Sequence, residues 1–121
     1  MKNDYSNYED LNLRDAQLIM KSILKDIAVI CDKHNIRYFL DAGTLIGAVR
    51  HKGFIPWDDD IDIGMLREDY EKFLSVVKNE LPEHLFLQTH ENDLGYDIYQ
   101  VPCKIRYNDT LYIEEKIVEN E

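Results

Sequence analysis

Apolar residues recur every three or four positions in two stretches of the chain, which is the spacing of one buried helix face. The first stretch predicts a helix over residues 12–34, and Asn35 is a suitable C-terminal stop. The second predicts a helix over residues 67–81 that ends before Pro82. Core packing is the expected role of both. The apolar stripe of the first helix consists of Ala16, Ile19, Met20, Ile23, Ile27, Ile30 and Cys31.

Shorter runs of β-branched and aromatic residues predict strands in the rest of the chain. After the first of these runs, a turn at residues 41–43 precedes a short helix that Thr44 caps and that ends at Arg50 or His51. Helices and strands therefore mix along the chain, and this order predicts an α+β fold. The predicted strands cover residues 36–40, 60–64, 85–89, 97–106 and 110–113.

The length of 121 residues predicts one domain, over residues 1–121, or the N-terminal part of one. With 24 acidic and 14 basic side chains, the formal charge is −10. Such a charge repels a phosphate backbone, so we expect no nucleic-acid partner. A phosphorylated small molecule stays possible, because a bound divalent cation reverses the local charge.

Two features indicate the compartment. Cys31 and Cys103 are far apart, lack metal-type spacing and sit among apolar residues, so we expect buried free thiols in a reducing environment. The N-terminus has no apolar signal core, and no apolar run approaches the length of a membrane span. These observations predict a cytoplasmic protein, with docking to the inner membrane surface left open.

The most unusual segment of the chain is an acidic cluster between Trp57 and Gly64. If the strand extends back to residue 58, alternation places Asp58, Asp60 and Asp62 on one face. Carboxylates so close together repel by up to about 3 kcal/mol in a partly buried site, and a divalent cation removes that cost. We therefore predict a site for Mg²⁺ or Mn²⁺ here, with Asp58, Asp60 and Asp62 as the candidate ligands.

Other interpretations of the acidic cluster fit less well. A solvated acidic loop would not usually interleave with β-branched residues. An EF-hand loop starting at Asp58 needs glycine and glutamate where the chain has Ile63 and Tyr70. An aspartyl-nucleophile phosphatase usually has threonine or valine where the chain has Gly64.

Candidate substrate-binding residues flank this cluster. Gly43 and Thr44 lie where a strand meets a helix, so the backbone can approach a phosphate closely. Arg50, His51 and Lys52 follow, and we expect Arg50 first and Lys52 second to contact a phosphate, with His51 structural.

Two later positions carry alternatives. Trp57 either stacks on a base or fills the core. Lys104 alternates with Arg106 on a late strand, where both either line the cleft or face solvent.

The stretch YFLDAGTLIGAVRHKGFIPWDDDIDIGMLREDYEKFL resembles the LicD family, whose members are similar to nucleotidyltransferases in fold. The resemblance is dense over residues 36–74. It implies a nucleotidyltransferase-like mixed sheet flanked by helices, with Gly43 and Thr44 against the donor phosphate and Asp60 and Asp62 as paired metal ligands.

The resemblance also implies a reaction: a phosphorylated alcohol, such as phosphocholine, moves from a CDP-linked donor to a cell-surface glycan or its precursor. The fold normally takes a third carboxylate from a later strand, and here only Glu114 or Glu115 could supply it. The alternative is a truncated module that binds metal or nucleotide without turnover.

Overall fold

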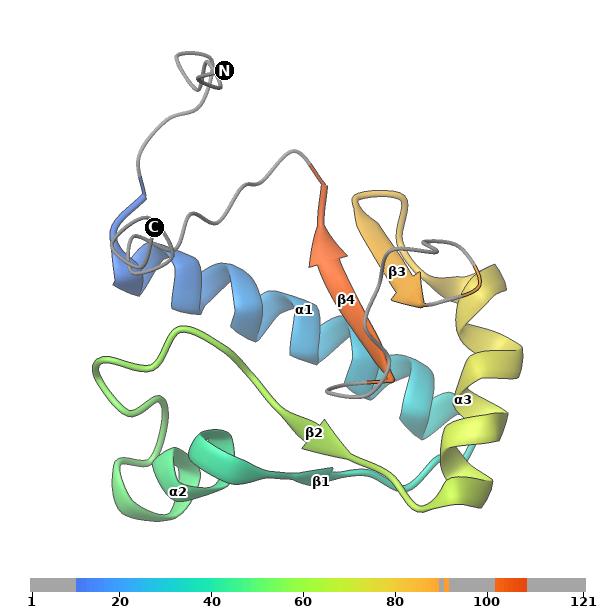
Figure 1. Ribbon diagram of the computed structural model, residues 1–121, viewed down its shortest axis with the longest axis horizontal. Coiled ribbons are helices and arrows are strands. Elements are labelled where there is room, and N and C mark those ends of the chain that lie inside the picture. The colour runs from blue at the N-terminus through green and yellow to red at the C-terminus, as the bar shows by residue number, and fades with distance from the viewer. Residues whose placement is uncertain (1–10, 90, 92–101, 109–121) are drawn as a thin grey trace, which may run out of the picture.

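The computed structural model of the chain describes residues 11–89, 91 and 102–108. Helices and strands alternate along these residues up to the last two elements, which are both strands (Figure 1), and this mixture confirms the α+β class. The elements are α1 (Leu13–Lys33), β1 (Phe39–Leu40), α2 (Ala42–Arg50), β2 (Ile63–Gly64), α3 (Arg67–Glu80), β3 (Leu85–Thr89) and β4 (Cys103–Tyr107).

Helix α1 has a polar cap at each end. The side chain of Asn12 accepts a hydrogen bond from the backbone N–H of Asp15 at 2.8 Å. At the other end Asn35 takes the left-handed conformation, with φ of 55°. The N–H of Ile36 then donates to the carbonyl oxygen of Cys31 at 2.9 Å, which satisfies an orphan carbonyl of the last turn. Both the predicted helix and its stop are confirmed.

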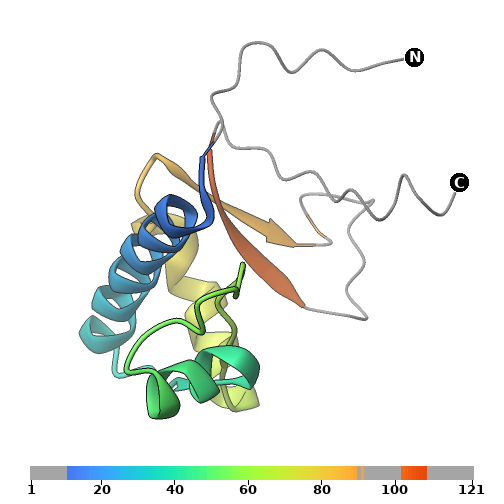
Figure 2. The same cartoon turned by 90° about the vertical axis from the view of Figure 1, so that its left-hand side faces the viewer.

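The core lies where α1 and α3 meet strand β3 (Figure 2). Helix α3 presents Phe73 and Val77 to it, as the helical spacing predicts. This helix ends because Leu81 precedes Pro82 and takes an extended conformation, with φ of −66° and ψ of 129°. The buried members of the core are Ile27, Ile30, Cys31, Ile36, Phe73, Val77 and Leu87.

The expectation of one mixed sheet is not met within the described residues. They form two separate two-stranded antiparallel sheets, β1 with β2 and β3 with β4. The first ladder is short because side chains take neighbouring backbone donors: Asp69 accepts from the N–H of Arg37, and Thr44 accepts from the N–H of Asp62. The predicted strands at 36–40 and 60–64 therefore shorten to two residues each.

Other expectations are met in part. Strand β3 covers the predicted residues 85–89, and β4 begins within the predicted strand at 97–106. Residues 97–101, the predicted strand at 110–113, and Glu114 and Glu115 lie outside the described residues. Cys31 is buried and Cys103 is half-buried, and both thiols are free. Among the described helices, none is both long and apolar enough to span a membrane.

Candidate metal centre

The acidic residues lie on a loop that connects α2 to β2. Residues 58–61 are unpaired, because the β1–β2 ladder joins only Phe39 to Gly64 and Leu40 to Ile63 and is followed by a single hydrogen bond, from the N–H of Asp41 to the carbonyl oxygen of Asp62 at 3.0 Å. The strand alternation that would place Asp58, Asp60 and Asp62 on one face is therefore wrong. The loop brings together consecutive residues instead.

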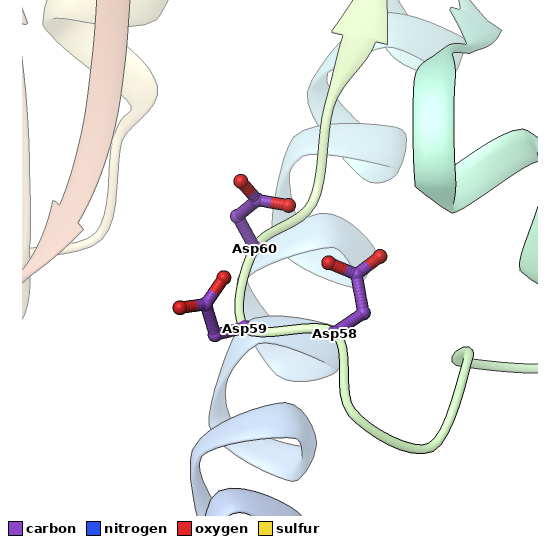
Figure 3. A group of neighbouring side chains, drawn as sticks. All are labelled: Asp58, Asp59 and Asp60. Carbon is purple, nitrogen blue, oxygen red and sulfur yellow. The ribbon is translucent and has the colours of Figure 1, made fainter.

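Three neighbouring carboxylates form the cluster. One oxygen each of Asp58, Asp59 and Asp60 lies within 4.8 Å of the others, and Figure 3 shows the three side chains around one bend of the loop. The carboxyl groups of Asp58 and Asp60 lie close enough to share a hydrogen bond when one of them is protonated. Asp62 is half-buried and lies outside this group of three, although its charge acts on Asp60. We call Asp58, Asp59 and Asp60 the acidic cluster.

Asp58 holds the most constrained oxygen of the cluster. Its Oδ2 atom is buried and has no hydrogen-bond partner. It lies against Gly43, where an added Cβ would come within 2.8 Å of it. A buried carboxylate oxygen without a donor is costly, so this atom calls for a proton or a cation.

The pKa of Asp60 is raised by burial and by the neighbouring carboxylates. Partial burial raises the pKa of this carboxyl from its usual value near 3.8 to about 6, with further contributions from the charge of Asp62 and the hydrogen bond with Asp58. The charges of Asp58 and Asp59 act in the same direction. The neighbouring carboxylates therefore oppose the ionisation of Asp60, although this residue is exposed.

Two polar side chains fasten the loop at either end of the acidic segment. Thr44 Oγ1 accepts a hydrogen bond from the N–H of Asp62 at 2.8 Å. Gln17 of α1 donates through Nε2 to the carbonyl oxygen of Asp58 at 2.9 Å. The sequence interpretation missed Gln17, although a signal exists: it precedes Leu24 and Cys31 by seven and fourteen residues, which places a polar side chain on their face of α1.

The start of α2 differs from the prediction. Asp41, not Thr44, is the cap: its side chain accepts from the N–H of Ala42 at 2.9 Å, and its carbonyl accepts from the N–H of Leu45. Ala42 begins the helix with φ of 47°. Gly43 and Thr44 are thus inside the first turn rather than before it. This change frees the Thr44 hydroxyl to hold the acidic loop.

Helix α2 also contacts the loop that leads to Asp58, through Gly47. An added Cβ on Gly47 would lie 2.4 Å from the carbonyl oxygen of Gly53 and 2.9 Å from the N of Ile55. Only a glycine allows the loop backbone to cross the helix at this distance. The path towards Asp58 therefore depends on close contact with α2.

The remaining candidate residues are exposed. Arg50 and Lys52 face solvent at the end of α2, as does His51, whose N–H donates to the carbonyl oxygen of Gly47 at 2.8 Å. Trp57 is 75% exposed, so the interpretation that it fills the core is wrong, and stacking on a ligand stays a prediction.

Lys104 on β4 is exposed, and so is Arg106 two residues later. This agrees with the simpler of the two alternatives for these strand residues. Whether they also line a cleft stays a prediction.

The acidic cluster fits a hard divalent cation. Its donors are carboxylate oxygens, the type that Mg²⁺ and Mn²⁺ prefer. Ligands at about 2.1 Å from one ion lie at most about 4.2 Å apart, so small side-chain rotations bring the cluster to coordination distance. The unpartnered Oδ2 of Asp58 and the space left by Gly43 favour the same conclusion.

Comparison with known proteins agrees with the motif. The chain is 49% identical over 85 residues to the lipopolysaccharide cholinephosphotransferase LicD of Haemophilus influenzae, which is 70% of this chain and 32% of that protein. It is 50% identical over 86 residues to an uncharacterized protein of Rickettsia prowazekii, covering 71% of this chain and 31% of the other. The chain thus spans about a third of these relatives.

A more distant match extends to mammals. The human ribitol 5-phosphate transferase FKRP is 36% identical over 50 residues, which is 41% of this chain and 10% of that protein. No solved structure matches the chain. The family model described as the LicD/FKTN/FKRP nucleotidyltransferase domain matches residues 35–113, and the chain therefore belongs to the LicD family.

Proposed function

We propose that the acidic cluster binds Mg²⁺ or Mn²⁺ in a transferase that moves a phosphorylated alcohol. The observation that carries this proposal is the buried Oδ2 of Asp58, which has no donor and sits beside two further carboxylates. Asp58, Asp59 and Asp60 would be the ligands. Asp62 would act as a neighbouring charge, or as a ligand after a rotation of its side chain.

The names of two relatives support the substrate class. One is a lipopolysaccharide cholinephosphotransferase and the other a ribitol 5-phosphate transferase, so both names describe transfer of a phosphorylated alcohol. We infer the same class here, with phosphocholine as one candidate group. A CDP-linked compound is the proposed donor and a glycan, or its precursor, the proposed acceptor.

Each candidate residue has a proposed task. The metal would polarise the donor diphosphate and offset its charge. Arg50 and Lys52 would bind phosphate oxygens, because a planar guanidinium and an ammonium both suit that ligand. The exposed ring of Trp57 would stack on the cytosine base, and Lys104 would contact the donor from β4. Gly43 would let the cluster approach α2 closely.

Calorimetric titration with CDP-choline tests the proposal. We expect binding in the presence of Mg²⁺ and at least about tenfold weaker binding in EDTA. Arg50→Ala should weaken nucleotide binding and leave Mn²⁺ binding unchanged, whereas Asp58→Asn should weaken both. Glu71→Gln on α3 is the matched control for loss of one exposed acidic charge. Equal affinity for CDP-choline with Mg²⁺ and with EDTA would contradict the proposal.

A turnover assay separates the enzyme from a binding module. CMP release from CDP-choline, with water or a lipopolysaccharide glycan as acceptor, would support a complete active site in this chain. Metal-dependent binding of CDP-choline without CMP release would favour the second candidate, a metal- and nucleotide-binding module. That candidate is worth keeping because, within the described residues, three aspartates on one loop make up the whole carboxylate group.

A further inference from the structure

Gln17 is a polar residue buried in the apolar side of α1. It is only 2% exposed, and the only other buried polar residue in the described part of the chain is Asp69. A buried amide must satisfy its donors and its acceptor, or it destabilises the fold. The question is therefore what its amide group binds.

The amide bridges α1 to the turn before the acidic cluster. Nε2 lies 2.9 Å from the carbonyl oxygen of Asp58 and 3.4 Å from those of Ile55 and Pro56. On its other side, Oε1 accepts a hydrogen bond from Arg14 Nη1 at 3.1 Å. A guanidinium beside one end and three carbonyls beside the other fix the orientation of the amide.

We propose that Gln17 is a positioning residue that sets the place of the Asp58 carboxylate in the metal centre. The proposal rests on the metal-binding role proposed above for the acidic cluster. The hydrogen bonds that Gln17 donates go to backbone carbonyl oxygens, one of which belongs to Asp58. Gln17 acts on the backbone that carries Asp58.

The backbone of Asp58 is held on both sides. Its N–H donates to the carbonyl oxygen of Ile55 at 2.9 Å, and its own carbonyl oxygen accepts from Gln17 at the same distance. With both groups bound, the direction of the Asp58 side chain towards Gly43 is defined. Loss of the Gln17 donor would release the turn, and Oδ2 would lose its fixed place.

This role gives α1 a part in the metal centre. Gln17 lies before residues 35–113, which are the residues that the family model matches. The acidic cluster and its supports thus come from separate parts of the chain, 41 residues apart between Gln17 and Asp58.

The test compares two variants of α1. Gln17→Met keeps the length of the side chain and removes its donors. Ile30→Val is the matched control, because it weakens the core at the far end of the same helix. Two quantities are measured for each protein: the Mn²⁺ dissociation constant by calorimetry, and the exchange rate of the Asp58 amide by NMR, with the Val77 amide as the reference for global opening.

We expect Gln17→Met to raise the Mn²⁺ dissociation constant about tenfold and to speed Asp58 amide exchange about fivefold. Ile30→Val should leave the Mn²⁺ dissociation constant unchanged, and it should not change the exchange rate of the Asp58 amide relative to that of the Val77 amide. If Gln17→Met leaves both unchanged, or if Ile30→Val weakens Mn²⁺ binding equally, the positioning role is refuted.

Failure of the proposed function gives a different result. If the unaltered protein binds no Mn²⁺, the metal centre itself is refuted. The exchange rates then decide the role of Gln17 in holding the turn: faster Asp58 exchange in Gln17→Met supports that role, and an unchanged rate overturns it.

Discussion

The Oδ2 atom of Asp58 has lost contact with water and gained no hydrogen-bond donor in exchange. Gly43 makes this position possible, because a Cβ atom at residue 43 would lie only 2.8 Å from the oxygen. Gly43 lies in the first turn of α2, where alanine has the higher helix propensity. A glycine that is unfavourable for its own helix is therefore best explained by the carboxylate beside it.

Gly43→Ala tests that explanation at the scale of one methyl group. The new Cβ would lie 2.8 Å from Oδ2 and displace the Asp58 carboxylate, so we expect at least about tenfold weaker Mn²⁺ binding. Gly53→Ala is the control, since no atom lies within 4 Å of its added Cβ. Isothermal titration of both variants checks the prediction. Equal Mn²⁺ affinity in the two would show that the space at Gly43 is unimportant.

The raised pKa of Asp60 predicts how the stability of the protein depends on pH. Its raised pKa, about 6 in the folded protein, means that folding favours the protonated carboxyl. Its contribution to stability is therefore complete below about pH 4 and is lost as the pH rises through 6. Asp60→Asn should stabilise the metal-free protein at pH 7 by about 1 kcal/mol, after allowance for solvent screening.

Urea denaturation in EDTA at pH 4 and at pH 7 measures this effect. The gain from Asp60→Asn should be present at pH 7 and nearly absent at pH 4. A variant that is less stable than the unaltered protein at pH 7 would indicate that Asp60 supports the fold instead.

At the scale of elements, Asp69 ties the first turn of α3 to the segment before β1. Its carboxylate accepts hydrogen bonds from the backbone N–H of Arg37 at 3.0 Å and from Arg37 Nε at 3.1 Å, and it forms an ion pair with Arg37 Nη2 at 3.1 Å. These contacts lower the pKa of Asp69, and the hydrogen bond from the backbone N–H of Arg37 contributes most. The sequence pattern gave no sign of this contact, because the partners are 32 residues apart.

Asp69→Asn should destabilise the protein at pH 7, because the new amide N–H₂ would face the guanidinium of Arg37. A carboxyl with a lowered pKa stabilises the fold above its usual pKa and loses that effect as the pH falls through the folded value, which lies below 3.8. The difference in unfolding free energy between the two proteins should therefore shrink below about pH 5.

Denaturant unfolding at pH 7 and pH 3 checks this prediction. Glu68→Gln, at the neighbouring exposed position of the same helix turn, is the control and should have little effect. If the difference in unfolding free energy between Asp69→Asn and the unaltered protein did not depend on pH, the charge of Asp69 would be unimportant for its contact with Arg37.

The elements that periodicity predicts well are those whose own residues determine them. Helices α1 and α3 are long, have continuous apolar stripes and end at Asn35 and before Pro82, so local rules suffice. The strands near the acidic cluster are different. Their lengths depend on distant side chains, Thr44 and Asp69, that bind the backbone donors a ladder would use.

At the scale of the whole molecule, the motif located the acidic cluster but not its geometry. Asp58 and Asp60 are in the acidic cluster as predicted, whereas Asp62 takes a flanking place because the loop does not alternate as a strand does. The position of Gln17 on the apolar face of α1 shows from the sequence that it is unusual, but its role could not be predicted because its partners, the carbonyl groups of residues 55–58, lie far away in the chain.

The net charge of −10 makes the acidic cluster the feature that most needs explanation. Three neighbouring carboxylates in a protein with excess negative charge repel one another, and a bound cation would offset that repulsion. Membership of the LicD family agrees with this interpretation. The chain spans about a third of the length of the two bacterial relatives described above. The central claim is therefore that the acidic cluster is a divalent-cation site.

Calorimetric titration of Mn²⁺ into the unaltered protein, Asp58→Asn and the Glu71→Gln control tests this claim most directly. The account predicts one binding site in the unaltered protein and in Glu71→Gln, with affinity at least about tenfold weaker in Asp58→Asn. Circular dichroism should show that all three proteins are folded. No Mn²⁺ binding by the folded unaltered protein, or the same affinity in Asp58→Asn, would contradict the account.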